Sequence, residues 1–167
     1  MSLDPLDARL LSLFAAEPRI GVMEASRRLG VARGTVQARL DRLERIGVVQ
    51  GWGPDLDPDA LGYPVTAFVT LEIRQGGGHD IVGDHLALIP EVLEAHTVTG
   101  PGDLWCRVVA RSNTDLQRVL DAVVSSPGIE RSATTISLAR QIDHRVLPLV
   151  RSITAHTGPA PTAGVTQ

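Results

Sequence analysis

The sequence predicts an α+β protein in which an N-terminal helix-turn-helix domain (winged-helix-like) is followed by a ferredoxin-like βαββαβ domain. Two observations carry this prediction. Apolar residues follow a helical period up to Gly47, and β-branched runs alternate with helical stripes from Val65 onward. The expected bounds are 1–50 for the helix-turn-helix domain, 51–64 for a strand and linker, 65–150 for the ferredoxin-like domain, and 151–167 for a flexible tail.

Three helices are expected in the first fifty residues. Asp4 followed by Pro5 is a helix start, with an N-cap and a proline at the first helical position. Gly30 supplies a tight turn before the third helix, and Gly47 ends that helix. The residue that precedes the third helix, Ala32, lacks a capping side chain worth about 1 kcal/mol. The expected helices span about 5–17, 22–29 and 33–46.

From residue 48 the pattern changes to strands and loops. Residues 48–64 are rich in Gly, Pro and Asp, which indicates a short strand and then a linker. Two turns, at Gly76–Gly78 and Gly100–Asp103, separate later elements, and Ser112 starts a capping-box sequence. Strands are expected at 65–73, 92–100, 103–111 and 129–139, with helices around 81–89 and 113–126.

The order of these elements leaves one sheet face to be covered. A βαββαβ sheet is antiparallel and carries both of its helices on the same face. The alternation within the strands gives no fully polar outer face, so the second face needs a partner. A second copy of the chain is the expected cover, which predicts a homodimer.

Composition and charge exclude several classes of protein. The chain has 167 residues, is 43% hydrophobic, and its one cysteine, Cys106, cannot form an internal disulfide. Neither a membrane span nor a signal-peptide pattern stands out, so a cytoplasmic protein without a membrane partner is expected.

All sixteen basic residues are arginine. Residues 1–50 hold eight Arg against six acidic residues (8 − 6 = +2), and the remainder holds eight against thirteen (8 − 13 = −5).

The basic charge gathers on the third helix. The stretch VARGTVQARLDRLERIG (31–47) carries four arginines beside an apolar stripe of Val36, Leu40 and Leu43. The opposite arc begins with small residues. Gly34 costs a plain exposed helix about 0.8 to 1.0 kcal/mol relative to alanine, whereas missing bulk helps a helix backbone to enter the major groove.

This arc supplies the candidate contacts to double-stranded DNA. First-turn side chains of a recognition helix meet base edges, and arginines further along meet phosphates. Charge alone leaves a second interpretation open, because an Asp41–Arg45 ion pair would also stabilise an ordinary solvated helix. The candidates are Arg33, Thr35 and Gln37 for bases, Arg42, Arg45, Arg27 and Arg28 for phosphates, Arg39 for either, and Gly34 and Ala38 as small positions.

Five segments, in this order, resemble the Lrp/AsnC (leucine-responsive, or feast/famine) family of transcriptional regulators. They are LDPLDARLLSLFAAEPRI, LGVARGTVQARLDRLERIGVV, DLDPDALGYPVTAFVTLEI, PEVLEAHTVTGPGDLWCRVVA and PGIERSATTISLA. The resemblance covers roughly residues 3 to 140. It implies a helix-turn-helix joined to a ligand-binding regulatory domain that dimerises through its sheet and often assembles into octamers. It also implies a small effector, commonly an amino acid.

The same resemblance points to an effector site near the second hairpin. Thr99-Gly100 and Asp103 match the family's Thr-Gly-x-x-Asp turn, where backbone N–H groups can hold a carboxylate and Asp103 an amino group. An ordinary hairpin turn explains the Gly and Asp equally well, and strand alternation explains the hydroxyl residues. The expected effector-binding residues are Thr99, Gly100, Gly102, Asp103, Ser132, Thr134 and His96.

No catalytic constellation, metal-ligand spacing or phosphate loop is recognised in the sequence, so no cofactor and no metal are expected. Two alternatives to a DNA-binding regulator stay open at this point. One is an enzyme similar to siroheme decarboxylases, which reuse both domains. His96 is the single candidate for a histidine in the cleft of such an enzyme. The other is a metabolite sensor that assembles without contacting DNA.

Overall fold

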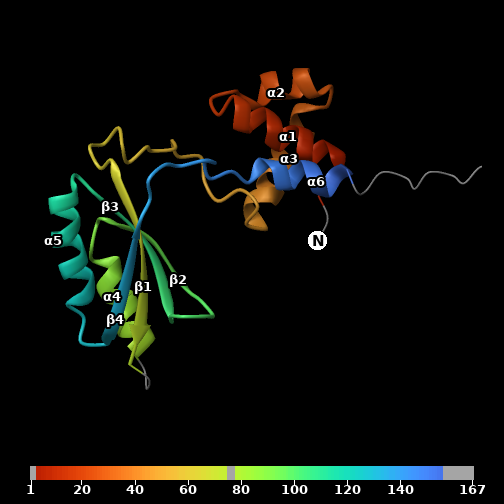
Figure 1. Ribbon diagram of the computed structural model, residues 1–167. Coiled ribbons are helices and arrows are strands. Elements are labelled where there is room, and N and C mark those ends of the chain that lie inside the picture. Colours follow the sequence, from red (N-terminus) through yellow and green to blue (C-terminus); the bar gives the residue numbers. More distant parts are fainter. Residues whose placement is uncertain (1–2, 75–77, 156–167) are drawn as a thin grey trace, which may run out of the picture. The chain divides into compact units, whose positions relative to one another are not determined.

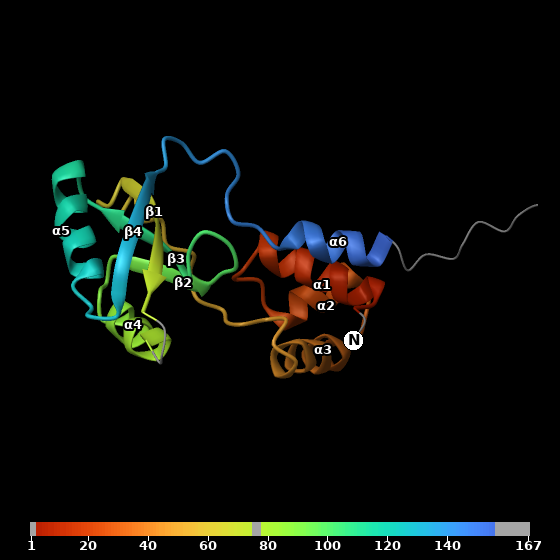
Figure 2. The same cartoon turned by 60° about the horizontal axis from the view of Figure 1, so that its bottom comes forward.

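The computed structural model describes residues 3–74 and 78–155, and the chain divides into two compact units. The N-terminal unit contains the described residues up to Pro54 together with those from Ile142 onward, and the sheet unit runs from Asp55 to Gln141. Figure 1 labels the elements of both units, and Figure 2 shows them after rotation. Within the described residues, no helix is long and apolar enough to span a membrane.

The N-terminal unit is a bundle of short helices around one apolar core. Its helices are α1 (Pro5–Ala16), α2 (Val22–Leu29), α3 (Arg33–Arg45) and α6 (Leu147–Ala155). The first three form the expected helix-turn-helix, and the buried side chains of α3 are those of the predicted stripe. The core consists of Leu10, Phe14, Ala25, Leu29, Val36, Leu40 and Leu43.

The helix ends follow the expected capping chemistry. The Asp4 side chain accepts a hydrogen bond from the Asp7 backbone N–H at 2.9 Å, and the Asp4 N–H donates to Asp7 Oδ2 at 3.1 Å, which completes a capping box. Gly30 adopts a left-handed conformation (φ 70°) that ends α2. Ala32 precedes α3 without any side-chain cap, as its sequence predicts.

The short strand predicted after α3 is not formed. Between Arg45 and Val65 all residues are described, and none lies in a strand. The Val48 and Val49 N–H groups instead donate to the Leu43 carbonyl, at 2.9 and 3.2 Å, in a turn around the end of α3. Because the helix end uses these N–H groups, they cannot pair in a ladder, and both valines pack against the helical core.

The predicted division at residue 150 is also wrong. Leu147–Ala155 forms helix α6, which packs along α1 (Figure 2), so the last described residues belong to the N-terminal unit. Val150 is buried, and Leu147 one turn earlier is half-buried, which gives α6 an apolar face. A flexible tail from residue 151 is therefore contradicted up to residue 155, and the rest of the predicted tail lies outside the described residues.

The sheet unit has the predicted βαββαβ order. Its four antiparallel strands lie in the order β2-β3-β1-β4, and α4 and α5 pack on one face. The buried core therefore lies between that face and the two helices (Figure 1). The elements are β1 (Val65–Ile73), α4 (Gly78–Ala87), β2 (Val92–Thr97), β3 (Leu104–Ala110), α5 (Asn113–Val124) and β4 (Ile129–Ile136).

The other sheet face, here called the open face, carries an aromatic pair. The rings of Phe68 and Trp105 stack with centroids 5.0 Å apart and an interplanar angle of 16°. The His96 ring lies 5.8 Å from Trp105, and Arg107 pairs with Glu94 at 3.1 Å on the same face. The helices of this unit cover the opposite face, so these half-buried and exposed groups are available to a partner.

Candidate functional site

The predicted recognition helix presents an exposed face of small and polar residues. Val36, Leu40 and Leu43 are buried against α1 and α2, which fixes the rotation of α3 about its axis. The exposed residues of α3 are Arg33, Gly34, Thr35, Gln37, Ala38, Asp41, Glu44 and Arg45. Six of the eight candidate DNA contacts on α3 are therefore exposed, and the other two, Arg39 and Arg42, are half-buried.

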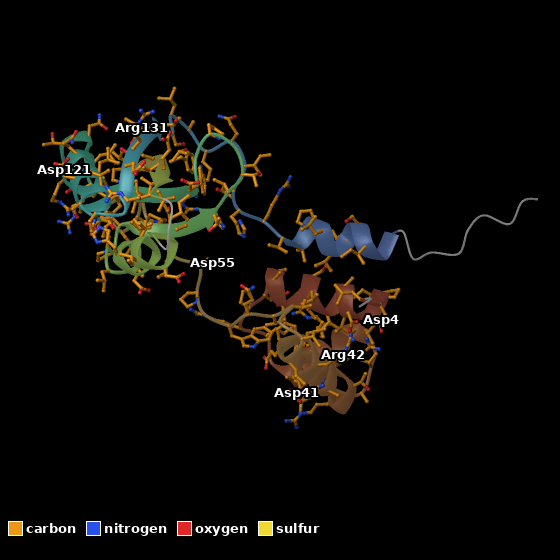
Figure 3. The ribbon with its side chains drawn as sticks, turned by 90° about the horizontal axis from the view of Figure 1, so that it is seen from below. Asp4, Asp41, Arg42, Asp55, Asp121 and Arg131 are labelled. Atoms are coloured by element: carbon orange, nitrogen blue, oxygen red, sulfur yellow. The ribbon has the colours of Figure 1, made fainter. Side chains whose placement is uncertain are left out.

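Arg42 and Arg39 are held by two acidic residues of α1. Asp7, whose side chain is 0% exposed, accepts from Arg39 Nη1 at 2.7 Å through Oδ1 and from Arg42 Nη2 through Oδ2. Asp4 accepts from the same Nη1 of Arg39 at 2.5 Å. This bond to Arg39 lowers the pKa of the Asp4 carboxyl, and Asp4 and Asp7 together raise the pKa of Arg39. Asp4, Asp7, Arg39 and Arg42 are hereafter called the acid clamp; Figure 3 labels two of them, Asp4 and Arg42.

The acid clamp borders a hollow of about 650 Å³ on the surface of α3. The remaining lining residues are Gly34, Thr35 and Ala38, the small positions of the predicted DNA-contacting arc. Sequence reasoning missed Asp7 entirely and assigned Asp4 only to helix capping. The sequence does contain a signal for the acid clamp, because its two acids and its two arginines are each spaced three residues apart. The acid pair and the arginine pair, however, lie about thirty-five positions apart in the chain.

The other predicted arginines divide into paired and unpaired groups. Arg28 pairs with Glu17, and with Glu24 at 3.2 Å, and Arg27 lies 3.6 Å from Glu24. Exposed pairs of this kind are worth little and are easily exchanged for other partners. Among the described residues no ion pair is formed by Arg33 or Arg45. The alternative Asp41–Arg45 pair is thus not formed, and Asp41 Oδ1 accepts from Gln37 at 2.7 Å. The two exposed arginines of α3 are thus the least engaged.

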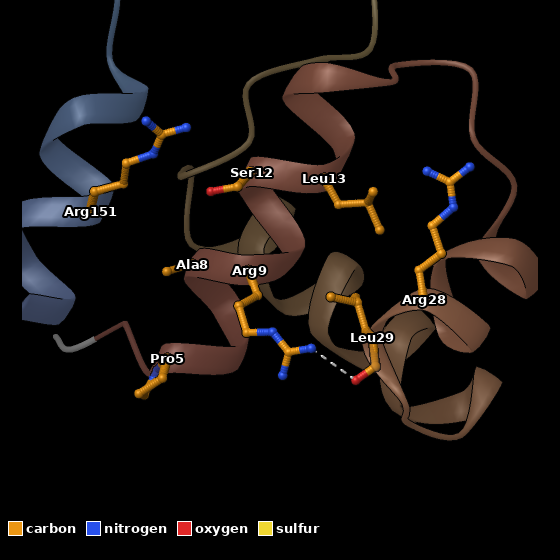
Figure 4. A pocket seen from close by; sticks show the side chains of 8 residues that line it. All are labelled: Pro5, Ala8, Arg9, Ser12, Leu13, Arg28, Leu29 and Arg151. Atoms are coloured by element: carbon orange, nitrogen blue, oxygen red, sulfur yellow. Dashed lines mark hydrogen bonds between the residues drawn. The ribbon is translucent and has the colours of Figure 1, made fainter.

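A second hollow, of about 630 Å³, lies among α1, α2 and α6 (Figure 4). Arg28 lines it, together with Arg9, whose Nη2 donates to the Leu29 carbonyl at 3.2 Å. The predicted phosphate contact at Arg28 therefore borders this hollow, whereas Gly34 and Thr35 border the hollow on α3. The full lining is Pro5, Ala8, Arg9, Ser12, Leu13, Arg28, Leu29 and Arg151.

In the sheet unit, the predicted effector turn is fastened to β1. The Asp103 N–H donates to the Leu71 carbonyl at 2.9 Å, and Asp103 Oδ2 accepts from the Ile73 N–H at 2.7 Å. The pairing of β1 with β4 shifts register between Glu72 and Ile73, so Asp103 supplies a hydrogen bond where the ladder is irregular. Asp103 therefore has a structural role, which is the alternative that the sequence left open.

The glycines of this turn serve different purposes. A Cβ on Gly102 would lie 2.3 Å from Thr70 Cγ2 and 3.3 Å from the Leu71 carbonyl oxygen, so the turn needs glycine to approach β1. Gly100 has φ 124° and open space around it, and its neighbour Thr99 is exposed. The backbone at Thr99-Gly100 is therefore accessible to a ligand, whereas Gly102 packs closely against β1.

Gly102→Ala is expected to lower the free energy of unfolding by about 1 to 3 kcal/mol, because the added methyl group must displace Thr70 or the backbone of β1. Thermal unfolding of the full chain measures the change, with Gly53→Ala, where a Cβ meets no atom, as the matched control. An unchanged melting temperature for Gly102→Ala would show that the turn does not require this close approach.

The remaining effector candidates lie on opposite faces of the sheet. Ser132 and Thr134 are paired with Leu71 and Val69, which places them on the helix-covered face at the exposed edge strand β4. His96 is paired with Trp105 on the open face. The structure therefore does not bring His96 together with the two hydroxyl residues in one cleft. Strand register decides this, since residues directly opposite each other share a face.

No arrangement for metal or thiol chemistry is found in the described part of the chain. It holds no group of three or more His, Cys, Asp or Glu side chains that could bind a metal. Cys106 lies in the sheet core, and burial raises the pKa of its thiol to about 11. A thiol with so high a pKa is a poor nucleophile at neutral pH.

Comparison with known families identifies both units. Residues 3–44 match the AsnC-type helix-turn-helix domain, and residues 66–147 match the Lrp/AsnC ligand binding domain. The chain belongs to the Lrp/AsnC family of transcriptional regulators. This membership confirms the resemblance seen in the sequence and makes the N-terminal unit a DNA-binding domain and the sheet unit a ligand-binding domain.

Relatives of this Lrp/AsnC regulator extend the match over most of the chain. It is 33% identical over 138 residues to an HTH-type transcriptional regulator of Pyrococcus furiosus, which covers 83% of this chain and 93% of the relative. Its fold matches the structure of Escherichia coli AsnC with a TM-score of 0.82 at 26% identity, over 89% of this chain and all of the other. A transcriptional regulator from Neisseria meningitidis, solved in complex with L-Met, matches at fold level with a TM-score of 0.76, 24% identity, and coverage of 86% and 94%.

These matches decide between the regulator and the enzyme. The family models and the named relatives are transcriptional regulators, so the Lrp/AsnC chain is a DNA-binding regulator and not an enzyme. The siroheme-decarboxylase interpretation is therefore set aside. His96, the residue that suggested it, contacts Trp105 and Glu94 on the open face.

Proposed function

We propose that this chain is a homodimeric, sequence-specific regulator that inserts α3 into the major groove and binds an amino acid in its sheet unit. The observation that carries the DNA part is the exposed face of α3. Gly34 there has open space where a Cβ would be, so nothing within the described structure requires a glycine. A residue that weakens its own helix and is not needed for packing fits a surface that an outside partner must approach closely.

Substitutions of Gly34 separate helix stability from DNA contact. Gly34→Ala and Gly34→Gln are both expected to raise the free energy of unfolding by about 0.5 to 1 kcal/mol, because helix propensity improves. Only Gly34→Gln is expected to weaken DNA binding strongly, about tenfold or more, because its side chain occupies the groove-facing space. Urea unfolding and titration of fluorescent duplex DNA measure the two effects. Wild-type affinity in Gly34→Gln would show that this face stays outside the groove.

The proposed contacts on α3 divide by position. Arg33, Thr35 and Gln37 lie in the first turns and are assigned to base edges, while Arg45 at the far end is assigned to a phosphate. In a dimer, two copies of α3 would meet successive major grooves about 34 Å apart, or a multiple of that spacing. A pseudo-palindromic operator is the corresponding DNA sequence.

The open face is the proposed dimer interface. Phe68 and Trp105 form a stacked aromatic centre, and the Glu94–Arg107 pair lies beside it. An aromatic centre with a polar surround is the composition of many protein interfaces. Octamers built from these dimers are part of the same proposal and would be detected as a heavier species at higher protein concentration.

An amino acid is the proposed effector. The accessible backbone at Thr99-Gly100 supports carboxylate binding, and Ser132 and Thr134 are exposed on β4 as further polar groups. Asp103 Oδ2 is engaged with the Ile73 N–H, which leaves Oδ1 for an amino group. The L-Met complex of the Neisseria meningitidis relative lends support at fold level only.

Footprinting on the DNA upstream of the chain's own gene tests this proposal. Purified protein is expected to protect a pseudo-palindromic segment, and one or more members of a panel of the twenty amino acids are expected to shift the protected length or the affinity. Arg33→Ala and Arg45→Ala variants are compared with the wild type in the same assay. Absence of a salt-sensitive footprint, on this DNA and on duplexes selected from a random pool, would refute DNA recognition.

A further inference from the structure

The acid clamp places two carboxylates beside the proposed DNA-binding face of α3. Two arginines that would neutralise phosphates are paired with two carboxylates, so the cluster has no net charge. Carboxylates near a DNA surface repel phosphates. Their presence beside the hollow on α3 therefore needs a compensating benefit, or else they oppose binding.

The hydrogen-bond geometry indicates what that benefit is. A guanidinium has five N–H donors, and the acid clamp uses one terminal nitrogen of each arginine, Nη1 of Arg39 and Nη2 of Arg42. The side chains remain 27% and 38% exposed, respectively, and line the same hollow as the small residues of α3. Each guanidinium is thus fixed at one side, with further donors left over on the other nitrogens.

Fixing an arginine before it binds has a known physical consequence. A free arginine side chain loses rotamer freedom when it contacts a phosphate, and a side chain already held in place loses less. Asp7 is fully buried and its backbone belongs to the first turn of α1, so it is a rigid anchor for the two flexible side chains. Charge-assisted bonds of this kind have defined geometry.

We propose that Asp7, assisted by Asp4, is a positioning residue that holds Arg39 and Arg42 with their outer N–H groups directed to DNA phosphates beside the hollow on α3. Arg39 and Arg42 make the contacts, and the two acids act only through them. The proposal rests on the proposed DNA-binding function and deepens it by naming the residues that prepare the phosphate contacts.

The positioning role and simple charge repulsion predict opposite changes in DNA affinity when Asp4 or Asp7 loses its charge. Removing an acidic charge near DNA tightens binding if the carboxylate merely repels phosphates. Asp4→Asn and Asp7→Asn are expected to weaken binding instead, about threefold to tenfold each, because Arg39 and Arg42 lose their anchor. Asn caps helices as well as Asp does, so Asp4→Asn preserves the start of α1. Asp41→Asn, an equal charge change on the exposed face of α3, keeps the Oδ1 acceptor for Gln37; it is the matched control and is expected to leave binding unchanged or tighter.

Titration of fluorescent duplexes, selected from a random pool by the wild-type protein, gives the dissociation constants of the full-length variants at several salt concentrations. In an Arg39→Ala/Arg42→Ala background, Asp7→Asn is expected to cause no further weakening, whereas a purely structural role would still weaken binding there. Should Asp7→Asn fail to fold, Asp4→Asn and the same background, checked by circular dichroism, provide the test.

Two outcomes would overturn the inference. One is binding by Asp4→Asn and Asp7→Asn that is as tight as, or tighter than, that of the wild type, as in the Asp41→Asn control. The other is equal weakening by Asp7→Asn with and without the two arginines. In both outcomes the wild-type protein still binds DNA, so the proposed function stands. If the wild-type protein selects no duplex at all, the proposed function itself fails, and the positioning role with it.

Discussion

Asp7→Ala is expected to lower the free energy of unfolding of the N-terminal unit by about 2 to 3 kcal/mol. Asp7 is completely buried and accepts hydrogen bonds from Arg39, Arg42 and the Asp4 N–H. Removing one partner of a fully buried ion pair costs about 3 to 5 kcal/mol. Both arginines are partly exposed and can turn toward water, which places the expected loss below that range.

Fluorescence distinguishes the two units in this measurement. The chain has two tryptophans, and Trp52 reports on the N-terminal unit, since its ring lies edge-on to Phe14 at 5.3 Å and its Nε1 donates to Glu44 at 2.5 Å. Urea unfolding is followed in a Trp105→Phe background, so that Trp52 alone gives the signal. Asp41→Ala, at an exposed site, is expected to change stability by less than about 0.5 kcal/mol. Equal midpoints for the two variants would contradict the structural role of the acid clamp.

Trp105→Ala is expected to weaken the dimer by about 2 to 4 kcal/mol, which corresponds to a factor of about 30 to 1,000 in the dimer dissociation constant. Trp105 is the centre of the open face, stacked on Phe68 and close to His96. Large aromatic side chains at the middle of an interface dominate its binding energy. Loss of the ring removes contact area and also the support that holds Phe68 in place.

Sedimentation equilibrium of the full-length protein at low concentration gives the dissociation constant. Leu88→Ala is the matched control, because Leu88 is 82% exposed in the same unit and follows α4, which packs on the helix-covered face. The control is expected to remain as dimeric as the wild type. A dimer of undiminished affinity in a folded Trp105→Ala variant would place the interface elsewhere.

Most elements of the fold were predictable because their signals are local. The α1 start at Asp4-Pro5 and the Gly30 turn depend on neighbouring residues, and both occur as expected. The apolar stripe of α3 likewise gave its buried face correctly. Helix α6 was missed because residues 147–155 gain their stability from packing on α1, which is distant in the sequence.

The candidate sites depended on contacts that a sequence pattern does not contain. The acid clamp joins α1 to α3, so its four residues could be listed but not paired. In β2 the register shifts between Val92 and Glu94, and this bulge moves His96 to the face opposite that of Val92. Simple alternation puts the two residues on one face, and for that reason the sequence could not place His96 relative to Ser132 and Thr134.

The salt dependence of binding shows whether the exposed face of α3 binds duplex DNA through its arginines. The logarithm of the association constant of the wild-type protein for a selected duplex is expected to fall linearly with the logarithm of salt concentration. Arg45→Ala is expected to reduce that slope by about 1, and Arg74→Ala, in the sheet unit, to leave it unchanged. Salt-independent binding, or identical slopes for the wild type and Arg45→Ala, would show that the arginines on this face of α3 do not contact phosphates.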